Sequence, residues 1–297
     1  IAEGFFFTPG FTPGSRSVLG SVYRQTTVQK MEDLKLHYHV VACIDILGQQ
    51  SHLKMFSGLT LSEKDREALT KAARNSFGVV NQLRSEFEKS FRSFEQIGMP
   101  DSSILSAEQI SMLFALAKCE IKNQGFSDTV LISVSFDRHQ NPLPITSIRA
   151  VLASCAGLFL DLLVAKHPLR GGIELGLAGK TNDGGIYGPA LAEASYLEKR
   201  IAEYPRIVIG KRLVQYLQKA CTVTDSDFEG GTAKVEAELT REYAKSCLEL
   251  IATNKEGNAI LDYLGPGFRK TISDKGIPQV LAAHQFILEE AKRFKKE

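Results

Sequence analysis

The segment that most constrains the fold is the run YHVVACIDIL, residues 38–47. It is short, apolar and rich in β-branched residues, which is typical of a strand buried on both faces of a sheet. We therefore predict a central strand here. Asp45 lies inside this run, and a buried carboxylate is costly unless it is paired with a cation or bound to a metal. The strand thus marks Asp45 as a candidate functional residue.

Strand-like and helix-like segments alternate along the rest of the chain. Ser62, followed three residues later by Asp65, resembles a capping box at the start of a long amphipathic helix, with Gly78 inside it as a candidate break. The other predicted elements are strands at 128–136, 169–178 and 205–209, an edge strand at 259–264, and helices at 146–166, 189–203, 235–251 and 278–296. This alternation favours an α/β or α+β layer fold with helices packed on a mixed sheet.

The composition gives no sign of a nucleic-acid or membrane partner. The 36 basic and 34 acidic side chains leave a formal net charge of +2, well short of the basic excess that nucleic-acid binding needs. The longest apolar run, residues 148–164, is interrupted by Arg149 and Asp161, so it predicts a buried helix and no membrane span. Five widely separated cysteines favour free thiols in a reducing compartment, and we expect a cytoplasmic protein.

Asp45 and Asp128 are the carboxylates that stand at the ends of apolar strands, in CIDILG and GFSDTVLIS. Such a position fixes a side chain on a rigid scaffold and leaves it beside a cleft. Mg²⁺ and Mn²⁺ prefer oxygen ligands and commonly take one or two carboxylates together with substrate phosphates. The pair therefore indicates metal-assisted phosphoryl chemistry, although a single aspartate in such a place is as often a turn or cap residue.

Other catalytic motifs are missing. The phosphate-binding loop GxxxxGK[ST] is absent, because Glu174 stands where its first glycine would precede Gly179, Lys180 and Thr181. The chain also lacks a GxSxG nucleophile elbow and an HExxH zinc motif. Lys180 remains a candidate for phosphate binding, with a plain hairpin lysine as the alternative.

Separated segments of the chain resemble, in order and spacing, the catalytic domains of class III adenylyl and guanylyl cyclases. CIDILG at 43–48 is similar to their first metal-binding strand, and FSDTVLIS at 126–133 to their second metal-aspartate hairpin. RGGIELG at 170–176 and IYGPALAEASYLEKR at 186–200 resemble the strand and helix that carry their transition-state residues. The resemblance covers residues 38–210, with a weaker echo at 259–265. It implies an α+β, ferredoxin-like core with a mixed or antiparallel sheet flanked by helices.

The same resemblance implies a homodimer with active sites at the interface and two divalent cations per site, Mn²⁺ or Mg²⁺. Asp45 and Asp128 would hold both ions, with the carbonyl of Ile46 as a further ligand. The chain would then consist of an N-terminal extension, residues 1–30, and a cyclase-like catalytic domain, residues 31–297. Within that domain we expect a core at 38–265 and a C-terminal helix at 278–296.

Several positions depart from the family pattern. Ala192 and Tyr196 stand where the transition-state Asn and Arg are expected, and Gln124 and Gly185 stand where the purine-reading Lys and Asp are expected. With these substitutions the chain resembles the bacterial Pycsar pyrimidine cyclases, which make cyclic UMP or cyclic CMP in antiphage defence and signal to a separate effector. We therefore expect a pyrimidine nucleoside triphosphate as substrate, UTP in preference to CTP.

Other residues are expected to take over the missing contacts. Gln124 offers an amide to the edge of a pyrimidine base, and Tyr196 and Lys180 are further substrate-binding candidates. Arg200, one helical turn beyond Tyr196, is the candidate catalytic cation for the charge on the α-phosphate, with Arg170 or Lys180 as substitutes. The alternative interpretation of Arg200 is a solvated residue at a helix end.

Two further functions stay open. The missing Asn and Arg favour a catalytically inactive, cyclase-like module that binds a nucleotide or a partner protein, whereas the two retained aspartates argue against it. A purine cyclase with rearranged base contacts is the other hypothesis, and the triphosphate that the protein consumes would distinguish it.

Overall fold

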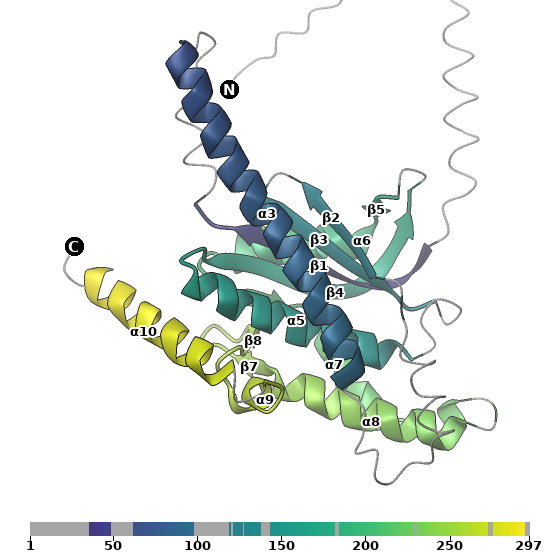
Figure 1. Ribbon diagram of the computed structural model, residues 1–297. Coiled ribbons are helices and arrows are strands. Elements are labelled where there is room, and N and C mark those ends of the chain that lie inside the picture. Colours follow the sequence, from purple (N-terminus) through teal and green to yellow (C-terminus); the bar gives the residue numbers. More distant parts are fainter. Residues whose placement is uncertain are drawn as a thin grey trace, which may run out of the picture.

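The computed structural model describes residues 36–48, 62–97, 119, 121–126, 128–137, 143–181, 184–228, 230, 232–272 and 276–294. The proposed N-terminal extension, residues 1–30, lies outside these ranges, as does Ser127. The described residues form one layered unit in which helices flank a sheet (Figure 1).

The sheet has eight strands within the described residues, in the order β2-β3-β1-β4-β6-β8-β7, with β5 paired to β4. The strands are β1 Leu36–Ile46, β2 Ile121–Phe126, β3 Thr129–Ser135, β4 Leu169–Lys180, β5 Ile186–Tyr187, β6 Ile207–Ile209, β7 Ile251–Thr253 and β8 Ala259–Leu261. All neighbours are antiparallel except β4 and β6, which are parallel. The predicted α+β class with a mainly antiparallel sheet is confirmed.

Two strand predictions can be compared directly with the sheet. The strand around Asp45 is internal, as predicted, because β1 pairs with β3 on one side and β4 on the other. The strand predicted at 259–264 is present as β8, Ala259–Leu261, but its predicted position at the edge of the sheet was wrong. Strand β8 pairs with β6 and β7, and the unpredicted β7 takes the position at the end of the sheet.

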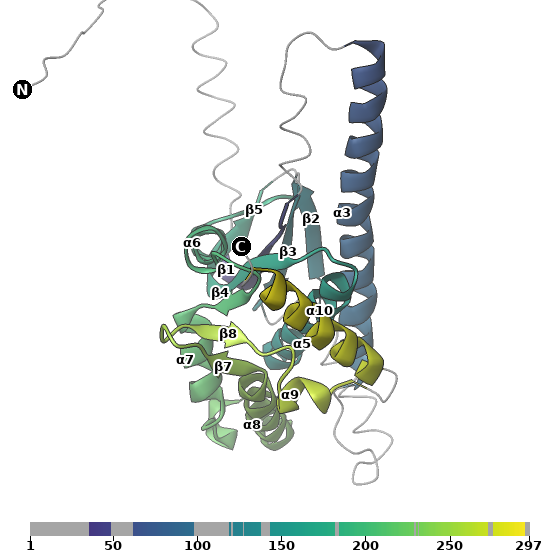
Figure 2. The ribbon, with the colours of Figure 1, turned by 90° about the vertical axis from the view of Figure 1, so that its left-hand side faces the viewer.

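Helices cover both faces of the sheet. They are α3 Glu63–Ile97, α5 Pro144–Val164, α6 Pro189–Tyr196, α7 Lys211–Ala220, α8 Ala233–Glu249, α9 Pro266–Arg269 and α10 Ile277–Phe294, with a π-helical turn η1 Leu197–Ile201 and a 3-10 turn η2 Asp225–Asp227. Figure 2 shows α3 and α6 on opposite sides of the strands. The predicted capping box opens α3, since the Ser62 hydroxyl accepts from the Asp65 amide at 3.2 Å and an Asp65 oxygen accepts from the Ser62 amide at 3.1 Å. Gly78 does not break the helix.

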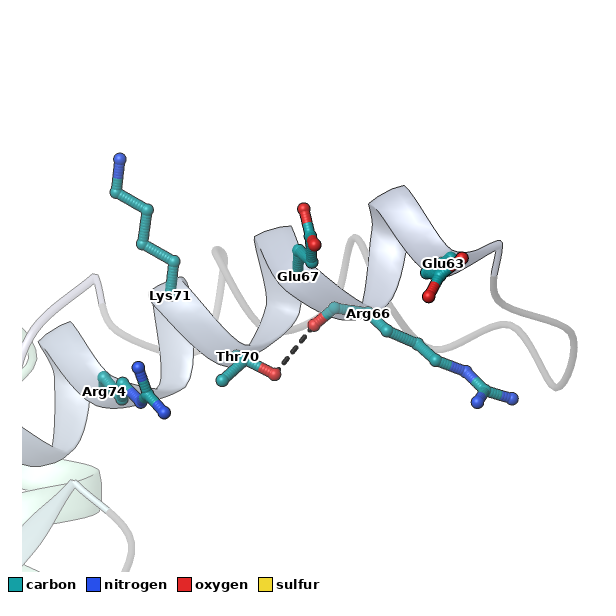
Figure 3. Close-up of a pocket in the computed structure, with 6 residues that line it drawn as sticks. All are labelled: Glu63, Arg66, Glu67, Thr70, Lys71 and Arg74. Atoms are coloured by element: carbon teal, nitrogen blue, oxygen red, sulfur yellow. Dashed lines mark hydrogen bonds between the residues drawn. The ribbon is translucent and has the colours of Figure 1, made fainter.

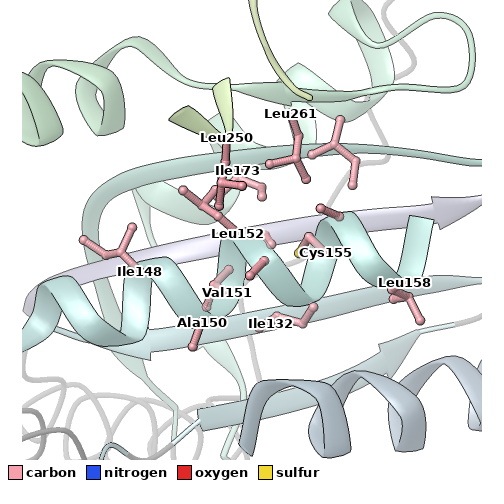
Figure 4. Close-up of a cluster of buried hydrophobic side chains, with 14 of the residues drawn as sticks. Ile132, Ile148, Ala150, Val151, Leu152, Cys155, Leu158, Ile173, Leu250 and Leu261 are labelled. Carbon is pink, nitrogen blue, oxygen red and sulfur yellow. The ribbon is translucent and has the colours of Figure 1, made fainter. Parts of the chain in front are cut away.

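Strand β1 contributes to two apolar clusters because its side chains alternate between the faces of the sheet. Ile44 and its even-numbered neighbours join the main core with α3 and α5, part of which is drawn in Figure 4. Val41 and Cys43 join a second cluster with Ala190 and Ala194 of α6. Asp45 follows Cys43 by two residues, so the pleat directs it toward the face that α6 covers.

Helix α5 is the central helix of the main core. It packs against α3, α8 and α10. Within the described residues it alone is long and apolar enough to cross a membrane, with 78% of its apolar window buried. The sequence argument against a span was therefore wrong about length and polarity, because the helix begins at Pro144, before the apolar run. The prediction of a buried helix is confirmed.

Two glycines of β4 let α6 lie directly on the sheet. A Cβ atom at Gly172 would overlap the carbonyl oxygen of Ala194 and the Cβ of Leu197, and one at Gly176 would lie 3.3 Å from the Cα of Ala190. The small residues of α6 and these glycines therefore fix how closely the helix approaches the strand.

We expect Gly172→Ala to destabilise the protein by about 2 kcal/mol, because α6 must move away from β4 to make room for the methyl group. Gly78→Ala is the matched control, since nothing lies within 4 Å of its Cβ position on α3. That variant is expected to gain up to about 1 kcal/mol from helix propensity. Urea unfolding followed by circular dichroism measures both, and equal losses in the two variants would contradict the close packing of α6.

Candidate functional site

Asp45 is held by side chains from the two strands that flank β1. In the register of the sheet it lies opposite Thr129 of β3 and opposite Arg170 of β4. The Thr129 hydroxyl donates to Asp45 Oδ1 at 3.2 Å, and the Arg170 guanidinium lies 3.1 Å from Oδ2. Asp45 is only 7% exposed. Strand pairing thus places a buried carboxylate within a defined set of partners.

Asp128 lies beside Asp45, in the turn just before β3. Its backbone carbonyl accepts from the Ile46 amide at 3.2 Å, and its side chain is buried. Burial raises the pKa of Asp45, the charge of Asp128 raises it further, and the Arg170 guanidinium opposes both effects. The structure therefore brings together the two aspartates that the sequence singled out.

Glu198 is a third carboxylate in this cluster, and the sequence analysis missed it. It belongs to η1, is 1% exposed, and its Oε1 lies 2.7 Å from Arg170 Nε. Burial raises the pKa of Glu198, Arg170 lowers it, and Asp45 raises it. One signal was present in the sequence: Glu198 follows Ala194 by four residues and so shares the face that packs on β4.

The cluster carries more negative than positive charge. Asp45 and Glu198 both contact the guanidinium of Arg170, and the charge of Asp128 acts on Asp45. An excess of buried carboxylate is what a hard divalent cation would neutralise, so Asp45, Asp128 and the Ile46 carbonyl fit such an ion by their chemistry. No group of three or more His, Cys, Asp or Glu side chains suited to a metal is found within the described ranges. The remaining ligands would come from substrate or water, as is usual for Mg²⁺.

A pocket of about 610 Å³ lies next to the carboxylates. Cys43, Thr129 and Leu131 line it from the sheet, and residues between Tyr187 and Lys199 line it from the α6 side. Thr129 belongs to both features, because its hydroxyl also donates to Asp45. The pocket therefore adjoins the carboxylate cluster through Thr129, while the carboxylates themselves are not among its described lining residues.

Two of the other predicted substrate contacts, Gln124 and Lys180, are not among the described residues that line this pocket. Gln124 of β2 donates from Nε2 to the carbonyl of Gly184 at 2.7 Å. Lys180 ends β4, ten residues beyond Arg170, so up to about 33 Å of strand separates the two. Together with burial, the charge of Lys180 lowers the pKa of His39 to about 4.

The two candidates near the end of α6 are exposed. Tyr196 is 54% exposed and Arg200 lies exposed on η1. Neither lines the pocket, whereas Ala192, Ser195 and Lys199 do. The prediction from periodicity assumed an α-helix through Arg200, but the chain enters a π-helical turn at Leu197.

Comparison with known proteins gives only remote similarities. No protein-family model matches the chain, and no curated protein matches it either. Three solved structures are similar over much of the chain. The adenylyl cyclase CyaB from P. aeruginosa has a TM-score of 0.40 and 15% identity over 63% of this chain and 83% of its own.

The other two structures are similarly distant. The catalytic core of a rhodopsin-guanylyl cyclase with converted specificity, in complex with ATPalphaS, has a TM-score of 0.36 and 14% identity over 63% of this chain and 84% of its own. A class III adenylyl cyclase-like ATP-binding protein from Pseudomonas aeruginosa has a TM-score of 0.40 and 13% identity over 71% of this chain and 41% of its own. Similarity at this level does not assign the chain to a family.

A larger hollow, of about 760 Å³, lies along the first turns of α3 (Figure 3). Its described lining consists of polar side chains, among them Glu63, Arg66 and Lys71, which project from one exposed helix. The hydrogen bond drawn there joins the Thr70 hydroxyl to the Arg66 carbonyl within the same helix. All the described residues that line this hollow belong to α3, whereas the pocket beside Asp45 is lined from both the sheet and α6 and remains the candidate site.

Proposed function

We propose that this protein is a nucleotidyl cyclase that converts a nucleoside triphosphate to its 3′,5′-cyclic monophosphate and pyrophosphate. The observation that carries the proposal is the buried pair Asp45, on β1, and Asp128, in the turn just before β3, beside a pocket of about 610 Å³. Paired carboxylates with room for a triphosphate suit phosphoryl chemistry that relies on hard cations.

In this proposal some residues hold the metal ions and others orient the carboxylates. Asp45, Asp128 and the Ile46 carbonyl would hold two divalent cations, Mn²⁺ or Mg²⁺, which when bound activate a hydroxyl and neutralise phosphate charge. The ribose 3′-oxygen forms a bond to the α-phosphorus, the bond from that phosphorus to pyrophosphate breaks, and the hydroxyl proton passes to solvent. Thr129 and Arg170 orient Asp45 for this task through their contacts with its two oxygens.

The proposed substrate is a pyrimidine triphosphate, UTP in preference to CTP. Support comes from the resemblance to pyrimidine cyclases and from Gln124, whose bond to Gly184 uses one amide hydrogen and leaves the amide oxygen for a base. Lys180 is a proposed contact from the end of β4. Tyr196 and Arg200 are exposed, which suits contacts to substrate across a homodimer interface.

The proposed setting follows from the same resemblance. The protein would act in the cytoplasm as a homodimer with its active sites at the interface, and its cyclic UMP or cyclic CMP would activate a separate effector in antiphage defence.

Incubation of the purified protein with ATP, GTP, CTP and UTP, each with Mn²⁺, tests the proposal by mass spectrometry of the products. We expect cyclic UMP from UTP, with pyrophosphate in equal amount. Cyclic AMP or cyclic GMP as the main product would instead support a purine cyclase with rearranged base contacts. If no triphosphate is consumed, the cyclase proposal is contradicted.

A catalytically inactive nucleotide-binding or interaction module is the second candidate. It is favoured by Arg170, whose guanidinium already contacts Asp45 and Glu198 and so supplies a cation without any metal. Triphosphate binding without turnover would identify this function.

A further inference from the structure

The charge inside the pocket comes from one residue. Among the described residues that line it, Lys199 alone carries a charged side chain; the others are apolar, glycine, hydroxyl, tyrosyl or thiol groups. Lys199 makes no ion pair within the part of the chain that the structure describes. An ammonium without a carboxylate partner, at the wall of a pocket of about 610 Å³, is suited to an anionic ligand.

The geometry of the helix explains why Lys199 lines the pocket and Arg200 does not. The pocket-lining positions Gly188, Ala192, Ser195 and Lys199 follow one another at intervals of four, three and four, which is the repeat of a single helix face. Arg200 is the next residue along and therefore points in another direction around the helix axis.

Lys199 also adjoins the carboxylate cluster, because it directly follows Glu198 in η1. Cys43 lines the pocket from β1, and Glu198 contacts the guanidinium that holds Asp45. Lys199 therefore lines the pocket at the turn that also supplies Glu198 to the carboxylate cluster.

We propose that Lys199 binds the phosphate chain of the triphosphate in this pocket, whereas the sequence analysis offered Lys180 for phosphate binding and Arg200 for the charge on the α-phosphate. The inference rests on the proposed function for the identity of the ligand. A lysine binds phosphate as a compact point charge, and Lys199 is exposed, so its ammonium is accessible to a ligand in the pocket. No other charged side chain among the described lining residues is available to share the role.

The test compares variants by calorimetric titration with 3′-deoxy-UTP in Mn²⁺, which binds but lacks the attacking hydroxyl. Lys199→Gln is expected to weaken binding at least about tenfold, and Lys199→Arg to restore most of it. Inorganic tripolyphosphate is titrated as a second probe. The affinities of the wild type and the two Lys199 variants should follow the same order for it, because it carries only the phosphate part of the ligand. Lys245→Gln, an exposed lysine on α8, is the matched control and should bind as the wild type does.

Each outcome decides the proposal. The proposal is overturned if Lys199→Gln binds with wild-type affinity, whether or not Arg200→Gln binds more weakly. It is also overturned if the wild-type protein binds neither probe. Failure of the proposed function has a different signature. In that case the wild type binds 3′-deoxy-UTP but makes no cyclic product from any natural triphosphate. The ratio of the affinities of the wild type and Lys199→Gln for 3′-deoxy-UTP still decides the role of Lys199.

Discussion

Replacing Asp45 with asparagine is expected to abolish cyclic nucleotide formation, lowering the turnover rate by about a thousandfold or more. The substitution keeps the shape of the side chain and an oxygen for the Thr129 hydroxyl, which donates to Asp45 at 3.2 Å. It removes the negative charge that a divalent cation requires. Asp128→Asn should have an effect of the same size, because the two carboxylates are expected to hold the same ions.

Two measurements test this prediction. The first is the rate of product formation from UTP, and the second is the affinity for Mn²⁺, followed by the paramagnetic resonance of the free ion. Asp225→Asn, on the exposed turn η2, is the control and should leave both unchanged. The unfolding midpoint of Asp45→Asn without metal should not fall below that of the wild type, because burial and Asp128 both disfavour the charge at Asp45. A variant that is inactive because it is unfolded would show a lowered midpoint, and a fully active one would exclude Asp45 as a metal ligand.

The central strand and its aspartate were predictable because their signal is local. An apolar, β-branched run of this length has few alternatives to a buried strand, and β1 extends from Leu36 to Ile46, close to the predicted bounds. The second aspartate was predictable for the same reason, since it precedes the apolar strand β3. Pairing of these two strands then brings Asp45 and Asp128 together.

The partners of Asp45 were not predictable, because they depend on pairing between distant segments. Arg170 lies opposite Asp45 only through the register of β1 and β4, 125 residues apart in sequence. Glu198 joins the cluster because Gly172 allows η1 to approach the strand closely. Lys199 was missed because the sequence analysis placed the functional face through Tyr196 and Arg200, whereas the face that lines the pocket runs through Ser195 and Lys199.

Removing the guanidinium of Arg170 is expected to have the largest effect on stability. In Arg170→Met, the buried carboxylates Asp45 and Glu198 lose the cation that lies 3.1 Å from one and 2.7 Å from the other. We expect a loss of about 3 kcal/mol in the absence of metal, because breaking a buried ion pair leaves uncompensated charge. Adding Glu198→Gln to this variant should recover a large part of the loss, since it removes one of the stranded charges.

Urea unfolding in EDTA and in Mn²⁺ separates the contribution of the guanidinium from that of a bound cation. Lys89→Met is the matched control, because the Lys89 and Glu86 pair is equally short, at 2.8 Å, but exposed, and such pairs contribute little. If Asp45 and Asp128 bind the ion, Mn²⁺ should stabilise Arg170→Met more than it stabilises the wild type, since the ion replaces the missing positive charge. Equal stabilisation of both proteins by Mn²⁺ would mean that the cation binds elsewhere, and an unchanged midpoint in EDTA would mean that Arg170 does not compensate the buried carboxylates.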